Sequence, residues 1–222
     1  MTRQKSDARH QAILDAALAL FSGYGYRRTS VGDVAREAGI AKGTVYLYFE
    51  NKEALFAAVC RHVADRFLAR ARDAAASDRA LEDKIRTILS AKFSYLYQLV
   101  HSSPHAGEII ASKNQLASEV FRQADREFEQ ILASALAAGQ ERGEIELPDM
   151  PARDSESARK PGNRPDDAET ATAWAGALLI RCAFGNGASG ADQTPPTLEQ
   201  YNQRLADMTR VVLAGLRTGP AR

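Results

Sequence analysis

Two short helical stretches separated by Gly39-Ile40 constrain the fold of this chain more than any other sequence feature. The first stretch, SVGDVAREAG, begins with Ser30 and has Asp33 three residues later, which is the spacing of a capping box. The second stretch, AKGTVYLYF, follows the glycine turn and precedes a long run of helical periodicity that begins after Asn51. Two short helices joined by a glycine turn ahead of a long helix form the helix-turn-helix pattern.

Helical periodicity continues along the rest of the chain. Neither an alternating strand pattern nor a hairpin signal is present in the sequence. Residues 144–166 contain four prolines and many charges, and this composition predicts a mobile surface loop. The sequence predicts an all-α protein of about nine helices, at residues 7–22, 30–39, 41–48, 51–77, 81–100, 105–112, 114–143, 167–184 and 197–216.

Composition places the chain among soluble globular proteins. Of its 222 residues 45% are hydrophobic and 26% are charged, and no apolar run is long enough to cross a membrane. The first residues lack the apolar core of a secretion signal, and Cys60 and Cys182 lie in amphipathic patterns. We therefore expect a cytoplasmic protein with reduced cysteines and no membrane association. Residues 1–52 hold eight basic and five acidic side chains, which modestly favours an anionic partner there.

The second short helix has the residue types of a DNA-recognition helix, which lies in the major groove. Val45 and Phe49 are four residues apart, so we expect them to face the core of a three-helix unit. Lys42 offers a cation to a phosphate or a guanine edge, and Thr44 can bond a base. Thr29 and Ser30 stand at the start of the first short helix, and Lys52 stands at the start of the long one. Helix N-termini bind anions, so we expect these side chains to meet DNA phosphates. The predicted DNA contacts are Thr29, Ser30, Lys42, Gly43, Thr44, Tyr46, Leu47, Tyr48 and Lys52.

Residues 9–55 resemble the DNA-binding domain of the TetR/AcrR family of transcriptional regulators. The segment GYRRTSVGDVAREAGIAKGTVYLYFENKEAL carries the resemblance. Ala41 departs from the family pattern, in which serine is common, and the segment 144–166 is a second departure. The resemblance implies an N-terminal three-helix DNA-binding domain, residues 1–52, and a larger C-terminal helical domain for ligand binding and dimerisation, residues 53–222.

The resemblance also implies a function. A member of this family would bind a palindromic operator in double-stranded DNA as a homodimer and would be released by a small, largely apolar effector. An activator, or a regulator controlled by a protein partner without a small-molecule inducer, remains the alternative. The expected effector-binding residues are Phe93, Tyr97, Val100, His101, His105, Phe121, Phe128 and Trp174. The expected dimer interface includes Ala171, Ala175, Leu178, Leu205, Met208, Val212 and Leu216.

The sequence gives little support to other classes of function. It contains no glycine-rich phosphate loop and no nucleophile elbow, so we expect neither an enzyme nor a cofactor. The remote alternative is a metal-binding helical protein that uses His101, His105 and Glu108. Pro104 is expected to break the helix between the two histidines, which disfavours a shared metal ion.

Overall fold

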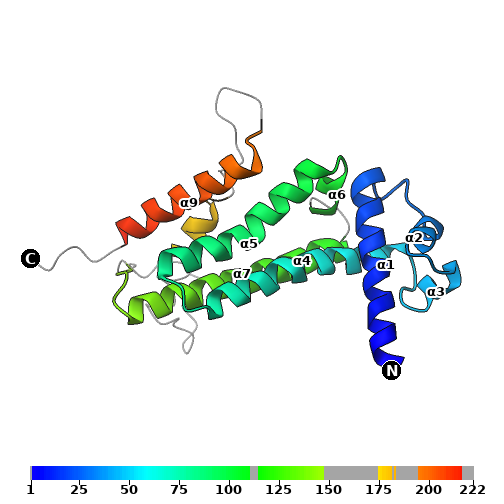
Figure 1. The fold of residues 1–222 in the computed structure, drawn as a ribbon, viewed down its shortest axis with the longest axis horizontal. Helices are drawn as coiled ribbons and strands as arrows, with labels where there is room; N and C mark the ends of the chain where they lie inside the picture. The colour runs from blue at the N-terminus through cyan, green and yellow to red at the C-terminus, as the bar shows by residue number, and fades with distance from the viewer. Residues whose placement is uncertain (1, 111–114, 148–174, 182, 184–194, 217–222) are drawn as a thin grey trace, which may run out of the picture. The chain divides into compact units, whose positions relative to one another are not determined.

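The computed structural model describes residues 2–110, 115–147, 175–181, 183 and 195–216 (Figure 1). These residues are helical or form turns and connections, and none of them lies in a strand, so the all-α prediction is confirmed. No helix within them is long and apolar enough to span a membrane. The helices are α1 (Thr2–Tyr24), α2 (Val31–Glu37), α3 (Lys42–Tyr46), α4 (Lys52–Ala76), α5 (Leu81–Ser102), α6 (Ala106–Ile110), α7 (Gln115–Glu141) and α9 (Leu198–Gly215), and residues 175–181 are also helical.

The chain divides into two compact units. The first comprises residues 1–67 and 96–125, and the second comprises residues 68–95 and 126–222. The division therefore falls inside α4, α5 and α7. The first unit contains all of the predicted DNA-binding domain, whose boundary at residue 52 stays a prediction.

The core of the first unit is built around one face of α1. Ile13 and Ala17 are fully buried and Phe21 is nearly so, as the helical spacing of the sequence predicts. The predicted start of this helix was wrong, because α1 begins at Thr2 and not at Asp7. Ser6 consequently lies inside the helix.

Helix α4 begins where the sequence predicts. The side chain of Asn51 accepts a hydrogen bond of 2.7 Å from the backbone of Ala54 and so satisfies the start of the helix. Farther along α4, Cys60 is completely buried and its thiol donates to the carbonyl of Ile109. Burial raises the pKa of this thiol to about 12, so Cys60 is a packing residue and not a reactive one. Cys182 lies outside the described residues.

The second unit packs its parts of α5, α7 and α9 through fully buried aliphatic residues such as Ile88, Leu132 and Leu205. Thr197 and Gln200 form a capping box at the start of α9. The segment after α7 is also packed here, because Ile145 and Leu147 are buried and the backbone of residue 146 donates to the carbonyl of residue 216. The prediction of a mobile loop was therefore wrong for residues 144–147, whose alternate apolar side chains anchor them, and residues 148–166 lie outside the described residues.

Candidate DNA-binding interface

Helices α2 and α3 form a helix-turn-helix in the first unit (Figure 1). Ser30 and Asp33 make the predicted capping box at the start of α2, with the Asp33 carboxylate accepting from both the hydroxyl and the backbone of Ser30. These hydrogen bonds lower the pKa of Asp33. Gly39 has a φ of +67°, which an L-residue rarely adopts, and this turn lets α3 start again at Lys42. Ala41 is the N-cap residue of α3 and provides no side-chain cap.

The two faces of α3 divide as the sequence predicts. Val45 is 1% exposed and Phe49 is 6% exposed, so both pack into the core of the unit. On the other side Leu47 is 83% exposed and Tyr46 is 47% exposed. A leucine and a tyrosine so open to solvent leave apolar surface that a thymine methyl group or a sugar could cover.

Lys42 and Gly43 add charge and access to this exposed face. Both residues are exposed, and the Lys42 ammonium lies 5.9 Å from the ring centre of Tyr46. A side chain at Gly43 would meet nothing within 4 Å, so the backbone of α3 is open to an approaching partner at this point. Thr44 is half-buried in the same short helix, and its contact with a base stays a prediction. The exposed face of α3 therefore combines a cation, an aromatic ring and an accessible backbone.

Tyr48 has a structural role that the sequence did not reveal. Its hydroxyl lies 3.3 Å from the Ser6 side chain and donates to the Ser6 carbonyl at 3.4 Å. The imidazole of His10 lies 5.9 Å from the Tyr48 ring and stacks at 5.3 Å on Phe49. Tyr48 thus connects the end of α3 to the first turns of α1, and its contact with DNA stays a prediction.

Lys52 is held by an aromatic neighbour. Its ammonium lies 4.2 Å from the ring centre of Tyr26, and the Tyr26 hydroxyl donates to Glu53 at 3.0 Å. Burial, the hydrogen bond to Glu53 and the charge of Glu53, in that order, raise the pKa of Tyr26 to about 12. The Tyr26 ring therefore gives the Lys52 ammonium a partner within the protein. The position of Lys52 at a helix start is then no longer a reason to expect a DNA phosphate beside it.

Thr29 requires a correction. Its side chain is 3% exposed, and its hydroxyl donates to the carbonyls of Gly25 and Leu20. The hydroxyl is directed into the unit because it satisfies the end of α1, so we leave Thr29 out of the proposed interface. Ser30 is exposed, but its hydroxyl already serves the capping box.

Helix α6 contacts the connection between α1 and α2. The His105 imidazole pairs with Glu108 at 2.8 Å, and the other carboxylate oxygen of Glu108 accepts from the backbone of Tyr26. The hydrogen bond to His105 is the main reason that the pKa of Glu108 is lowered. His101 instead stacks on Tyr97 at 3.9 Å and bonds its carbonyl, so it does not join the pair. Across the described residues no group of three metal-ligating side chains forms, and the metal-binding alternative is not supported.

The predicted effector residues are distributed over both units. Phe93 and Phe128 meet edge to face at 6.0 Å in the second unit, and both are buried. Beside them lies Lys92, which is 4% exposed and was not predicted. The sequence did contain a signal for it, because Lys92 lies in the apolar stripe of α5, four residues after Ile88. Tyr97, Val100, His101, His105 and Phe121 belong to the first unit, with Val100 and His101 exposed, and Trp174 lies outside the described residues.

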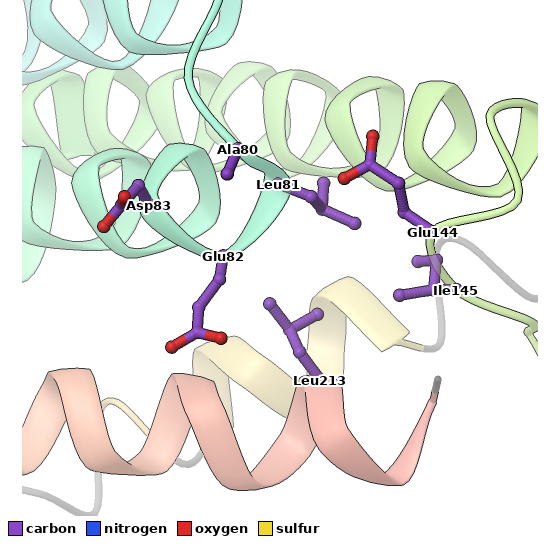
Figure 2. Close-up of a pocket in the computed structure, with 7 residues that line it drawn as sticks. All are labelled: Ala80, Leu81, Glu82, Asp83, Glu144, Ile145 and Leu213. Atoms are coloured by element: carbon purple, nitrogen blue, oxygen red, sulfur yellow. The ribbon is translucent and has the colours of Figure 1, made fainter. Parts of the chain in front are cut away.

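A cavity of about 420 Å³ lies elsewhere in the second unit (Figure 2). Figure 2 shows Leu81 from α5, Leu213 from α9 and Ile145 around a common space, with three carboxylates at its edge. Each of these carboxylates, on Glu82, Asp83 and Glu144, is paired with an arginine. None of the predicted effector residues lines this cavity.

The predicted dimer residues have different exposures. Ala175, Leu205 and Leu216 are buried within the protein's own core, so they are not available to a partner. Half-buried positions are Leu178, Met208 and Val212. Val211, which was not among the predicted residues, is 72% exposed beside Val212 on α9. Ala171 lies outside the described residues.

Comparisons with known proteins agree on the N-terminal region. Residues 13–59 match the family model described as bacterial regulatory proteins, tetR family. The fatty acid metabolism regulator protein of Bacillus subtilis is 31% identical over 88 residues, which cover 40% of this chain and 45% of that protein. The transcriptional repressor KstR2 of Rhodococcus jostii is 31% identical over 136 residues, 59% of this chain and 65% of that protein. The alignments thus span less than two thirds of either relative.

A solved structure extends the likeness to the whole fold. The transcriptional regulator FadR from Bacillus subtilis, solved in complex with stearoyl-CoA, covers 95% of this chain and 99% of its own, with a TM-score of 0.54. Its sequence identity to this chain is 20%, so the comparison supports the fold alone.

Proposed function

This chain belongs to the TetR family of bacterial regulatory proteins, and on that premise we propose that it is a ligand-responsive repressor of transcription. It would bind a palindromic operator in double-stranded DNA as a homodimer. A small, largely apolar effector, bound in the helical body, would release it. The name of one relative refers to fatty acid metabolism, and a related regulator binds stearoyl-CoA, which supports an effector of apolar character.

One observation carries the proposal. Opposite the buried side chains of Val45 and Phe49, helix α3 presents Lys42, Tyr46 and Leu47 to solvent. A helix that only completed a core would not need so much apolar and charged surface on its outer side. This face fits the major groove, where side chains of a recognition helix reach base edges and phosphates.

Regulation follows from differential binding. A dimer holds two recognition helices at a fixed separation, which sets the spacing of the two half-sites. An effector that binds more tightly to a state with another separation lowers the affinity for DNA by at most the ratio of its affinities for the two states. Repression without effector and release with it would then be two populations of one dimer.

Selection of bound sequences from random duplex DNA at near-physiological salt tests the proposal. We expect an enriched palindrome, which would give the operator and then the genes beside it. In vitro transcription from a promoter containing that palindrome separates repression from activation. If no sequence is enriched and only weak, strongly salt-dependent binding is found, the free protein does not read DNA sequence and the proposal fails.

A further inference from the structure

Lys92 is the only charged side chain that is buried among the described residues. It is 4% exposed, whereas the other charged residues of α5 are exposed or half-buried. The remaining buried polar residues are Ser22, Thr29 and Thr209, and each donates its hydroxyl to a backbone carbonyl. Lysine is among the residue types that are least often fully buried, so its position in this core is exceptional.

The surroundings of Lys92 include two aromatic rings. Its ammonium lies 4.7 Å from the ring centre of Phe128 and 5.4 Å from that of Phe93. The two rings stand at 87° to each other, and Leu89 and Leu132 on the same helices are fully buried. Aromatic faces stabilise a cation only in part. The result is a positive charge beside a largely apolar part of the second unit.

Stability does not explain this arrangement. A buried ion pair is often no more stable than apolar residues of similar volume, so a core selected for packing alone would favour leucine or methionine at this position. A buried charge in a ligand-binding body is instead a feature of a site that recognises the opposite charge. A buried lysine that is paired within the protein can also exchange its partner for an anionic ligand.

We propose that Lys92, Phe93 and Phe128 form a binding site for an apolar carboxylate, with the carboxylate on the Lys92 ammonium and the apolar part against the two rings. This inference rests on the proposed function, because it specifies the class of the effector. It specifies the small, largely apolar effector as an amphiphilic anion. A carboxylate brought to a desolvated ammonium gains the attraction of an ion pair in addition to a hydrogen bond, whereas an alcohol of the same length gains the hydrogen bond alone.

Binding of matched probes to the full chain tests the site without DNA. The probes are dodecanoate with dodecan-1-ol, and 4-phenylbutyrate with 4-phenylbutan-1-ol, below micellar concentrations, measured by titration calorimetry. We expect at least one carboxylate to bind at least about tenfold more tightly than its alcohol. If neither carboxylate is preferred over its alcohol, the proposal is wrong.

Variants at the same position test the residue. Lys92→Met should reduce the affinity for the preferred carboxylate at least about tenfold and change that for the alcohol less than about threefold, while Lys92→Arg keeps the preference. Lys84→Met, on the same helix and outside the buried core, is the matched control and should have no effect. Equal losses for carboxylate and alcohol would make Lys92 a packing residue, and circular dichroism would identify a variant that fails to fold.

The two proposals fail separately. Binding of a carboxylate through Lys92 without any enriched DNA sequence would overturn the repressor and keep the site. An enriched palindrome without carboxylate preference would keep the repressor and overturn the site.

Discussion

At the scale of single residues, Lys42 and Lys52 differ in the surroundings of their charges. Lys42 is exposed on the outer face of α3, whereas the Lys52 ammonium lies over the ring of Tyr26. We expect Lys42→Ala to weaken binding to all duplexes and to lower the slope of log affinity against log salt by about 0.9 for each phosphate that the lysine neutralises. Fluorescence anisotropy at several salt concentrations measures this slope.

Lys84→Ala is the matched control for the salt experiment, because it removes a lysine from the second unit. Its slope should equal that of the unchanged protein. An unchanged slope for Lys42→Ala would mean that Lys42 does not neutralise a phosphate.

Tyr26 makes the stability of the first unit sensitive to alkaline pH. Its pKa is about 12 in the folded protein against an ordinary value of 10.0, so the folded state holds the phenol proton more tightly than the unfolded chain. This contribution to stability is fully present below pH 10 and is lost as the pH rises through about 12. We expect Tyr26→Phe to flatten the fall in the free energy of unfolding between pH 10 and 12, measured by urea denaturation.

Tyr24→Phe provides the comparison, because Tyr24 is 64% exposed and two residues away. It should leave the alkaline pH dependence as it is. If Tyr26→Phe and Tyr24→Phe gave the same curve, the burial of Tyr26 and its hydrogen bond to Glu53 would have no influence on alkaline stability.

At the scale of elements, the turn between α1 and α2 depends on Gly25. Its φ is +88°, and a side-chain carbon there would lie 3.2 Å from the imidazole of His105 and 3.4 Å from the carboxylate of Glu108. We expect Gly25→Ala to lower the free energy of unfolding by about 1–3 kcal/mol, since backbone strain and crowding act together. Chemical denaturation followed by circular dichroism gives this value.

Gly23→Ala is the matched control, two residues before Gly25. Gly23 lies in the last turn of α1, and a side-chain carbon there meets nothing within 4 Å. Alanine should therefore stabilise the helix by about 0.5–1 kcal/mol. If both substitutions changed the free energy of unfolding in the same direction, the turn would not depend on the positive φ of Gly25.

The sequence predicted those elements whose signals are local. The capping box at Ser30 and the turn at Gly39 each depend on residues within four positions, and both predictions were correct. The caps at Asn51 and Thr197 are equally local. The early start of α1 was missed because the contact between Ser6 and Tyr48 spans 42 residues. The inward direction of the Thr29 hydroxyl and the contact of Lys52 with Tyr26 were missed for the same reason, because both depend on tertiary contacts.

At the scale of the whole molecule, the proposed dimer should depend on the part of α9 that its own core leaves open. Met208 and Val212 are less deeply buried and Val211 is 72% exposed, whereas Leu205 on the same helix is fully buried. We expect Val211→Glu to shift the protein from dimer to monomer, because each of the two copies would bury an unpaired carboxylate in the isologous interface. Sedimentation velocity measures the species present.

Gln203→Glu adds the same charge to α9 at another exposed position and should remain dimeric. The DNA measurements distinguish assembly from folding. A folded Val211→Glu monomer should lose affinity for a duplex with two half-sites and approach the affinity for a single half-site, because binding of the second half-site is no longer intramolecular. A Val211→Glu protein that stays dimeric at micromolar concentration would place the dimer interface on another face, and the spacing of the operator half-sites would then have to be explained by that face.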